Sequence, residues 1–172
     1  MEAAGNRVEI RKATRDDADA LIGLIIELAQ FEKLEPPDAD AQRRLVEDGF
    51  GPRPRYDAYL AFADGVAAGY AFVFETYSTF LARPTLYLED IFVKKDFRGR
   101  GAGLALFRKV VEEARDRGCG RLDFVVLDWN TGAQDFYKNL GVQHLDNWYN
   151  FRLTRDGFAG VLEPPPTPQG GK

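Results

Sequence analysis

Leu86-Tyr87-Leu88-Glu89-Asp90-Ile91-Phe92-Val93, followed by Arg98-Gly99-Arg100-Gly101-Ala102-Gly103, is the stretch that decides the fold of this 172-residue chain. Its first part is rich in aromatic and β-branched residues, which predicts a strand. Its second part is a glycine loop flanked by arginines. From about Ala102 to Arg117, apolar residues recur with the period of an α-helix. The sequence therefore predicts a strand, then a glycine loop, then a helix.

This loop has the features of an anion-binding site. Glycines let the backbone approach a ligand closely, and the unpaired N–H groups of a helix's first turn lie at the positive end of its dipole. Arg98 and Arg100 add cationic donors. We therefore predict that the loop binds a pyrophosphate, while a simple turn is the structural alternative.

Two other phosphate-binding motifs fit the loop less well. A P-loop is excluded because the chain contains no Gly-Lys-Ser or Gly-Lys-Thr. A dinucleotide-binding G-x-G-x-x-G that starts at Gly99 needs a third glycine where the chain has Leu104. Asp123 does lie about 20 residues downstream, as the ribose-binding acid of that motif does, so a dinucleotide-binding protein stays open as a remote alternative.

The rest of the sequence predicts one mixed α/β domain. The expected strands cover residues 8–12, 58–63, 66–77, 85–93, 121–127 and 148–154, and the expected helices cover residues 14–35, 41–47, 102–117 and 131–140. We place the domain at residues 7–162. We expect disorder at the N-terminus, residues 1–6, and in the Pro/Gly-rich tail, residues 163–172.

Composition narrows the function. Lys and Arg number 23 against 27 Asp and Glu, for a net charge of -4, which argues against nucleic acid or an anionic membrane as the main partner and favours a small cationic substrate. Cys119 is the single cysteine and His144 the single histidine, so the usual zinc sites cannot be assembled and we expect no metal. No signal peptide or membrane span is recognisable, which predicts a cytoplasmic protein.

The pattern Arg98-x-x-Gly101-x-Gly103 between a strand and a helix resembles the pyrophosphate loop of the GNAT superfamily of N-acetyltransferases, which bind acetyl-coenzyme A. Residues 10–14, 129–130 and 136–141 match as well. Within the superfamily the chain resembles the diamine and polyamine acetyltransferases, and most closely their thialysine N-epsilon-acetyltransferase branch, through residues 27–34, 47–51, 77–79, 86–93 and 127–130. The resemblance implies a GNAT fold, that is, a mixed central sheet with a splayed strand pair and flanking helices. It also implies a homodimer.

The same resemblance assigns residues to acetyl-CoA. The expected contacts are Ile91, Phe92, Val93, Arg98, Gly99, Arg100, Gly101, Ala102, Gly103, Leu104, Asn130, Ala133 and Tyr137. The backbone N–H of Val93 matches the donor that stabilises the oxyanion where the strands splay apart. Tyr137 matches the general acid that protonates the leaving thiolate, whereas without the resemblance it is typical of a packing residue.

Acetyl transfer to an amine needs a proton acceptor, because an alkylamine with a pKa of about 10.4 is protonated at neutral pH. Glu89 is the candidate base. Neighbouring residues of a strand point to opposite faces, so we expect at most one of Glu89 and Asp90 to line the amine channel. The expected substrate contacts are Phe31, Glu32, Glu89, Asp90, Asp123, Phe124 and Val125, with Phe80 as a further wall candidate. For Phe31, Phe80, Glu32 and Asp90 the alternative is a core aromatic or an exposed acid. Residues 123–125 are expected because the resemblance matches them to a strand segment on the substrate side, and an exposed acid is the alternative for Asp123.

Ser78 separates the branches of the family, because the polyamine acetyltransferases carry an acid there that reads the far end of spermidine. The resemblance therefore implies direct transfer to a shorter amine such as thialysine, ornithine, lysine or a short diamine. Phe80 departs from the Trp of the animal branches, so the channel wall can differ. Two alternatives remain: an acetyltransferase acting on a protein or peptide lysine or N-terminus, and a non-catalytic acyl-CoA-binding module.

Overall fold

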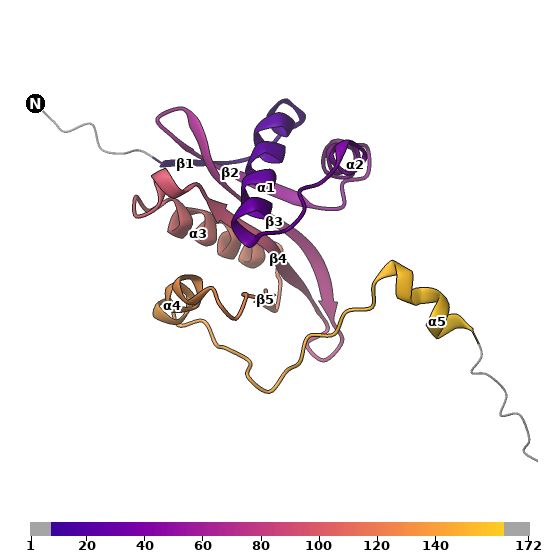
Figure 1. Cartoon of the computed structure of the whole chain (residues 1–172). Coiled ribbons are helices and arrows are strands. Elements are labelled where there is room, and N and C mark those ends of the chain that lie inside the picture. Colours follow the sequence, from indigo (N-terminus) through magenta and orange to yellow (C-terminus); the bar gives the residue numbers. More distant parts are fainter. Residues whose placement is uncertain (1–7, 164–172) are drawn as a thin grey trace, which may run out of the picture. The chain divides into compact units, whose positions relative to one another are not determined.

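The computed structural model describes residues 8–163, which divide into two units on either side of the Val125–Val126 bond (Figure 1). The strands of the first unit are β1 (Val8–Lys12), β2 (Asp57–Ala63), β3 (Val66–Ser78), β4 (Arg83–Val93) and β5 (Arg121–Asp123). Its helices are α1 (Ala18–Glu32), α2 (Ala39–Phe50) and α3 (Ala102–Asp116). The second unit contains α4 (Thr131–Asn139) and α5 (Phe158–Leu162).

The strands form one mixed sheet in the order β1-β2-β3-β4-β5. The first four are antiparallel neighbours, and β5 runs parallel to β4. The parallel pairing covers only Thr85 to Tyr87 of β4, although β4 continues to Val93. β5 ends at Asp123, so beyond Tyr87 β4 has no partner strand on this side in the described part of the chain. We call the stretch of β4 that follows Tyr87 the open edge.

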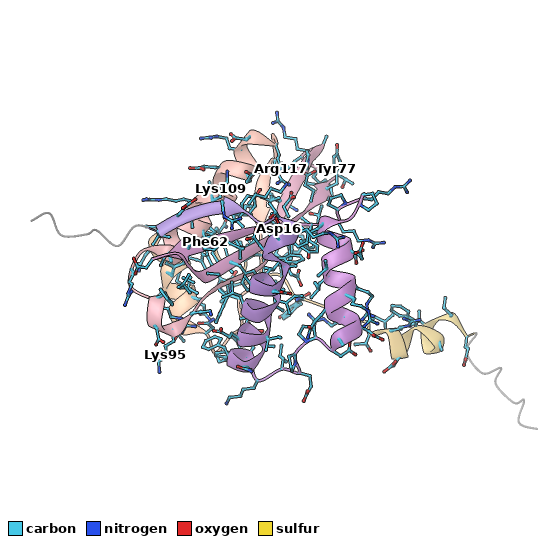
Figure 2. All side chains as sticks on the ribbon, turned by 90° about the horizontal axis from the view of Figure 1, so that it is seen from above. Asp16, Phe62, Tyr77, Lys95, Lys109 and Arg117 are labelled. Atoms are coloured by element: carbon cyan, nitrogen blue, oxygen red, sulfur yellow. The ribbon has the colours of Figure 1, made fainter. Side chains whose placement is uncertain are left out.

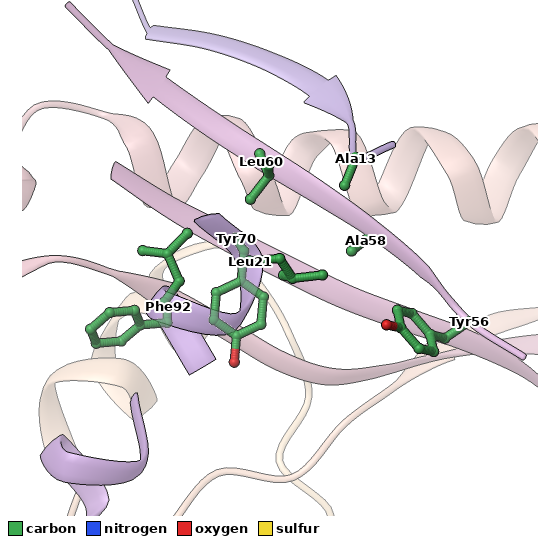
Figure 3. Packing of buried hydrophobic residues seen from close by; sticks show 8 residues of the cluster. Ala13, Leu21, Tyr56, Ala58, Leu60, Tyr70 and Phe92 are labelled. Carbon is green, nitrogen blue, oxygen red and sulfur yellow. The ribbon is translucent and has the colours of Figure 1, made fainter. Parts of the chain in front are cut away.

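Helices α1 and α3 cover opposite faces of the sheet (Figure 1). Leu21 of α1 packs in a buried cluster with Leu60 and Tyr70 of the sheet (Figure 3). On the other face, Lys109 of α3 lies 5.6 Å from the ring centroid of Tyr59. Tyr59 and Leu60 are consecutive in β2, so their side chains point to opposite faces. We refer to these as the α1 face and the α3 face.

Arg117, which follows α3, ties that helix to the sheet (Figure 2). Its Nη2 donates to Asp57 Oδ2 over 2.7 Å and to Glu113 Oε2 over 3.0 Å. Lys12 Nζ lies 2.6 Å from Asp57 Oδ1. Burial alone would raise the pKa of Asp57, but the hydrogen bonds from Lys12 and Arg117 outweigh it and lower that pKa. The carboxylates at this end of α3 are therefore held ionised.

The second unit differs from the prediction. Residues 142–154 contain neither helix nor strand, so the strand expected at residues 148–154 is wrong. An alternating pattern favours a strand only where a partner strand supplies the backbone hydrogen bonds. β5 is likewise shorter than the expected 121–127. The predicted disordered ends lie outside the described residues apart from Glu163, and no helix among residues 8–163 is long and apolar enough to cross a membrane.

Candidate active site

A β-bulge in β4 changes the direction of two carboxylates. Phe72 of β3 pairs with Asp90, and the next residue, Val73, pairs with Leu88, so Glu89 is the extra residue of β4. At a bulge, two residues of one strand oppose a single residue of the other, and the alternation of faces is broken. Asp90 therefore shares the α1 face with Phe72. The expectation that Glu89 and Asp90 point to opposite faces assumed an unbroken strand, and the bulge breaks that alternation.

Three carboxylates gather around the hydroxyl of Tyr70. Tyr70 is fully buried, at 0% exposure, and its Oη donates to Asp90 Oδ2 over 3.2 Å. Glu89 in the bulge and Glu32 at the end of α1 lie near enough for their charges to raise the pKa of both Tyr70 and Asp90. We call Glu32, Glu89 and Asp90 the acid cluster.

The acid cluster is not neutralised within the described part of the chain. None of its three carboxylates forms a salt bridge with a lysine or arginine of residues 8–163. Burial raises the pKa of Asp90 to about 6; the hydrogen bond from Tyr70 lowers it, and the charges of Glu89 and Glu32 raise it further. Burial also raises the pKa of Glu32. Such a cluster suits a cationic group, which would relieve the repulsion.

The open edge of β4 presents backbone N–H groups on the side away from β3. The N–H of Lys94 donates to the carbonyl of Ala68 over 2.8 Å, and Gly69 pairs with Val93. These two facts make Gly69 and Val93 a non-hydrogen-bonded pair, in which the N–H and C=O groups point away from the partner strand. By the alternation of an antiparallel ladder, the N–H of Ile91 points the same way. Both N–H groups thus face the side where β5 no longer pairs.

The loop after β4 places further N–H groups at the start of α3. Gly99 and Gly101 have φ angles of 74° and 86°, in the left-handed region that favours glycine. Gly101 is the N-cap of α3, and the first turn of that helix contains no acidic residue and no side-chain cap. The N–H groups of Ala102, Gly103 and Leu104 have no partner inside the helix, since the first turn never provides one. This arrangement suits an anion.

Arg98 connects the loop to the α1 face. Its Nε donates to the carbonyl oxygen of Val93 over 2.8 Å. Its guanidinium carbon lies 4.9 Å from the ring centroid of Phe31 and 5.7 Å from that of Phe92. Phe31 is the residue before Glu32 in α1, so Arg98 contacts the neighbour in sequence of one member of the acid cluster. Phe92 itself is 7% exposed, which makes its side chain part of the core.

The predicted substrate residues at β5 lie on different faces. Asp123 pairs with Tyr87 and so shares the α1 face, where its Oδ2 lies 2.8 Å from Arg121 Nε. The ring of Phe124 lies 5.9 Å from the ring of Phe107 in α3, which places it on the α3 face. Val125, the third predicted substrate residue of this segment, is exposed. Arg100, a predicted acetyl-CoA contact in the glycine loop, is exposed as well.

The positions that suggested a short substrate lie at the tip of the β3–β4 hairpin. Ser78 is 4% exposed, and its Oγ accepts a hydrogen bond from the N–H of Leu81 over 3.3 Å. Phe80 is fully exposed. Phe72 is the partner of Asp90 in the sheet. Ser78 lies six residues beyond Phe72 in β3, which in an extended strand is a distance of about 20 Å. Within one chain, neither Ser78 nor Phe80 therefore reaches the acid cluster.

The second unit carries the candidate acid. Asn130 is the N-cap of α4, and its Oδ1 accepts a hydrogen bond from the N–H of Ala133 over 3.2 Å. Tyr137 follows on the same helix, 7% exposed, with its ring 5.1 Å from that of Phe136. Burial raises the pKa of Tyr137 to about 12, so its phenol keeps its proton at neutral pH. A protonated phenol can serve as a general acid.

Nothing in the sequence indicates that Tyr70 belongs to the site. A tyrosine in an alternating strand is typical of a core residue, and Tyr70 is indeed in the core. The signal comes only from the register between β3 and β4, which brings its hydroxyl to Asp90.

Comparison with known proteins agrees with this geometry. Residues 24–142 match the model of the acetyltransferase (GNAT) family. The chain is 41% identical to thialysine N-epsilon-acetyltransferase from Bos taurus over 157 residues, covering 85% of this chain and 92% of the relative. It is 38% identical to L-ornithine N5-acetyltransferase from Arabidopsis thaliana over 98 residues, covering 57% of this chain and 43% of that relative.

A solved structure shares the fold. The aminoglycoside N-acetyltransferase AAC(6')-Iy, solved in complex with CoA, superposes with a TM-score of 0.73 at 24% identity and covers 90% of this chain and 99% of its own. GNAT acetyltransferases use acetyl-CoA, and the predicted fold class is confirmed. The chain therefore belongs to the acetyltransferase (GNAT) family.

Proposed function

We propose that this protein transfers the acetyl group of acetyl-CoA directly to a small primary amine, such as thialysine, ornithine, lysine or a short diamine. The observation that carries the proposal is the acid cluster. Its members Glu89 and Asp90 lie on the strand that forms the open edge and precedes the glycine loop, and Glu32 lies near them at the end of α1. A cation-binding face and an anion-binding loop thus occur on consecutive segments of one chain. A protonated amine is the cation that such a face would bind, and the pyrophosphate of a coenzyme A thioester is the anion that such a loop would bind.

The backbone of the loop fits acetyl-CoA. Its support is the pair of left-handed glycines, the unpaired N–H groups of the first turn of α3, and the absence of an acid in that turn. Acetyl-CoA supplies the acetyl group as a thioester. The residues proposed to hold it are Ile91, Phe92, Val93, Arg98, Gly99, Arg100, Gly101, Ala102, Gly103 and Leu104, with Asn130, Ala133 and Tyr137 of the second unit.

Three groups of the chain are proposed to take part in the transfer. Glu89 accepts a proton from the ammonium group, directly or through water, so that the amine becomes a neutral nucleophile. The N–H of Val93 donates to the carbonyl oxygen as negative charge develops on it. Tyr137 gives its proton to the departing thiolate. Each group acts on a different atom, and the proton removed from the amine is not the one that Tyr137 delivers.

The acid cluster also supports the choice of amine. Asp90 and Glu32 are proposed to bind the cationic groups of the substrate, with Asp123, Phe124 and Val125 as further contacts and Phe31 as part of the wall. The names of the relatives, thialysine and ornithine acetyltransferases, describe amino acids whose side chain ends in an amine. By the same likeness we propose a cytoplasmic homodimer with one domain at residues 7–162.

Release of free CoA tests the proposal. Initial rates are measured with thialysine, ornithine, lysine, putrescine and spermidine, and we expect faster turnover of the short amines than of spermidine. Glu89→Gln should lower kcat/KM by about 100-fold or more. Glu35→Gln, the matched change at an exposed acid outside the cluster, should leave the rate unchanged.

Two results would support the other candidates instead. Turnover of a lysine peptide without turnover of any free amine would identify a protein or peptide acetyltransferase. Binding of acetyl-CoA without CoA release for any amine or peptide would identify a non-catalytic acyl-CoA-binding module.

A further inference from the structure

We infer that Tyr70 is a positioning residue of the acid cluster, whose buried hydroxyl holds the Asp90 carboxylate in place to bind the ammonium group of the amine. The inference rests on the proposed function, because it requires an amine to enter the acid cluster. It concerns a residue that belongs to none of the sequence motifs described above.

Packing alone does not explain the hydroxyl of Tyr70. The ring belongs to the buried cluster of the α1 face, with Leu21, Leu60 and Phe92 (Figure 3). Figure 3 shows the hydroxyl on the side of the ring that points away from Leu60. A phenylalanine would fill the same apolar space, whereas a buried hydroxyl is costly unless it finds a hydrogen-bond partner. The partner that it finds is Asp90 Oδ2, at 3.2 Å.

The register of the sheet aims this hydroxyl at Asp90. Tyr70 pairs with Phe92, while Asp90 pairs with Phe72, two residues further along β3. Tyr70 and Asp90 are thus diagonal neighbours on the α1 face, a separation that a long aromatic side chain can bridge. This placement depends on the bulge at Glu89, because without it Asp90 would lie on the α3 face.

Asp90 needs a donor because its surroundings disfavour its charge. The charged and titratable groups near it are Tyr70 of β3, Glu89 of β4 and Glu32 of α1, and only Tyr70 stabilises the carboxylate. Burial and the two acids raise the pKa of Asp90, to about 6, while the phenol lowers it. Loss of the phenol would leave more of Asp90 protonated near neutral pH, and a protonated carboxyl cannot pair with an ammonium group.

Tyr70→Phe tests the inference, with Tyr56→Phe as the matched control. Tyr56 belongs to the same buried cluster, but its hydroxyl donates to the backbone carbonyl of Leu45 over 2.6 Å. We expect Tyr70→Phe to raise the KM for the amine by about tenfold at pH 7, as the loss of a hydrogen bond to a charged group implies. The kcat at saturating amine and the KM for acetyl-CoA should change little. The acid limb of the kcat/KM profile should move to higher pH.

Tyr56→Phe should leave the KM for the amine and the pH profile as in the wild type. Asp90→Asn provides a second test, which does not depend on the stability of the Tyr70→Phe variant. If Tyr70 acts through Asp90, then adding Tyr70→Phe to Asp90→Asn should produce no further loss of amine affinity.

Three outcomes would overturn the inference. An unchanged KM and pH profile in Tyr70→Phe, in an enzyme that acetylates amines, would overturn it and leave the proposed function standing. Equal losses in Tyr70→Phe and Tyr56→Phe would assign the hydroxyl to stability alone. A wild-type protein that acetylates no amine would overturn the proposed function and this inference with it.

Discussion

Asp90 links activity to stability at the scale of a single residue. Its folded-state pKa, about 6, exceeds the usual value of 3.8, so the folded chain takes up a proton between these values that the unfolded chain does not. The contribution of Asp90 to stability is therefore fully present below pH 3.8 and is lost as the pH rises through about 6. The carboxylate destabilises the fold at neutral pH, as expected of a residue kept to bind a cation.

Asp90→Asn should consequently stabilise the protein at pH 7, by about 2 kcal/mol, because it removes a charge that burial disfavours. The gain should shrink toward pH 4, where the wild-type carboxyl is already neutral. Denaturant unfolding at both pH values measures this, and amine turnover should fall in the same variant. A variant less stable than the wild type at pH 7 would contradict this assignment of the Asp90 environment.

Tyr137→Phe should lower kcat by about 100-fold, since the thiolate then leaves without a proton donor. The affinity for acetyl-CoA should stay within a few-fold, because the aromatic ring is retained. Tyr149→Phe, at a tyrosine of the second unit that is 84% exposed, is the control and should not alter either quantity. Full activity in Tyr137→Phe would remove Tyr137 from the mechanism.

At the scale of elements, the start of α3 depends on the backbone of Gly101. The φ angle of 86° there is unfavourable for any other residue, while a Cβ would meet no atom within 4 Å. Gly101→Ala should thus act through backbone strain, costing about 1 kcal/mol of stability, and should raise the KM for acetyl-CoA. Gly23→Ala, in α1, also has open space at the Cβ and should instead stabilise the chain by about 0.5–1 kcal/mol.

Denaturant melts and initial rates at varied acetyl-CoA compare the two glycine variants. Unchanged acetyl-CoA kinetics in Gly101→Ala would show that the loop does not need the left-handed turn to bind its ligand.

The elements around the site differ in how well the sequence predicted them. The strand, glycine loop and helix at residues 85–117 were predictable because apolar periodicity and glycine spacing are local signals. The bulge at Glu89 was not, because it exists only in the pairing of β4 with β3. The strand expected at residues 148–154 failed for the same physical reason, since alternation shows that a segment can pair but not whether a partner is present.

At the scale of the whole molecule, Arg117 holds the sheet and α3 together. It is 22% exposed and lies between Asp57 and Glu113. Burial opposes the charge of Glu113, but hydrogen bonds from Lys109, Tyr59 and Arg117 lower its pKa to about 2. Because this folded-state pKa is depressed, its contribution to stability is present above the unfolded value of 4.5 and is lost as the pH falls toward about 2.

Arg117→Met should destabilise the protein by about 2–3 kcal/mol at pH 7, because two partly buried carboxylates lose their shared cation. The difference from the wild type should become smaller at acid pH, where both carboxylates take up protons. Arg115→Met is the control, since Arg115 pairs only with exposed Asp116 in the described part of the chain and should show no measurable effect. A pH-independent loss in Arg117→Met would point to packing rather than charge.

The charges of the chain are segregated along β4 and the segment that follows it. The protein has a net charge of -4, yet Lys94, Lys95, Arg98 and Arg100 follow the strand, while Glu89 and Asp90 lie before its end. Under the proposed function, this segregation would place the anionic thioester next to the cationic amine. The charge pattern and the family resemblance were both readable from the sequence, whereas the bulge that places Asp90 on the α1 face required the structure.

A crystal structure of the full-length protein with CoA and thialysine tests this arrangement most directly. We predict the pyrophosphate on the N–H groups of residues 99–104, the CoA sulfur at the open edge near the N–H groups of Ile91 and Val93, and the ammonium group among Glu32, Glu89 and Asp90. CoA bound elsewhere at saturating concentration, with the glycine loop empty and no amine at the acid cluster, would contradict it.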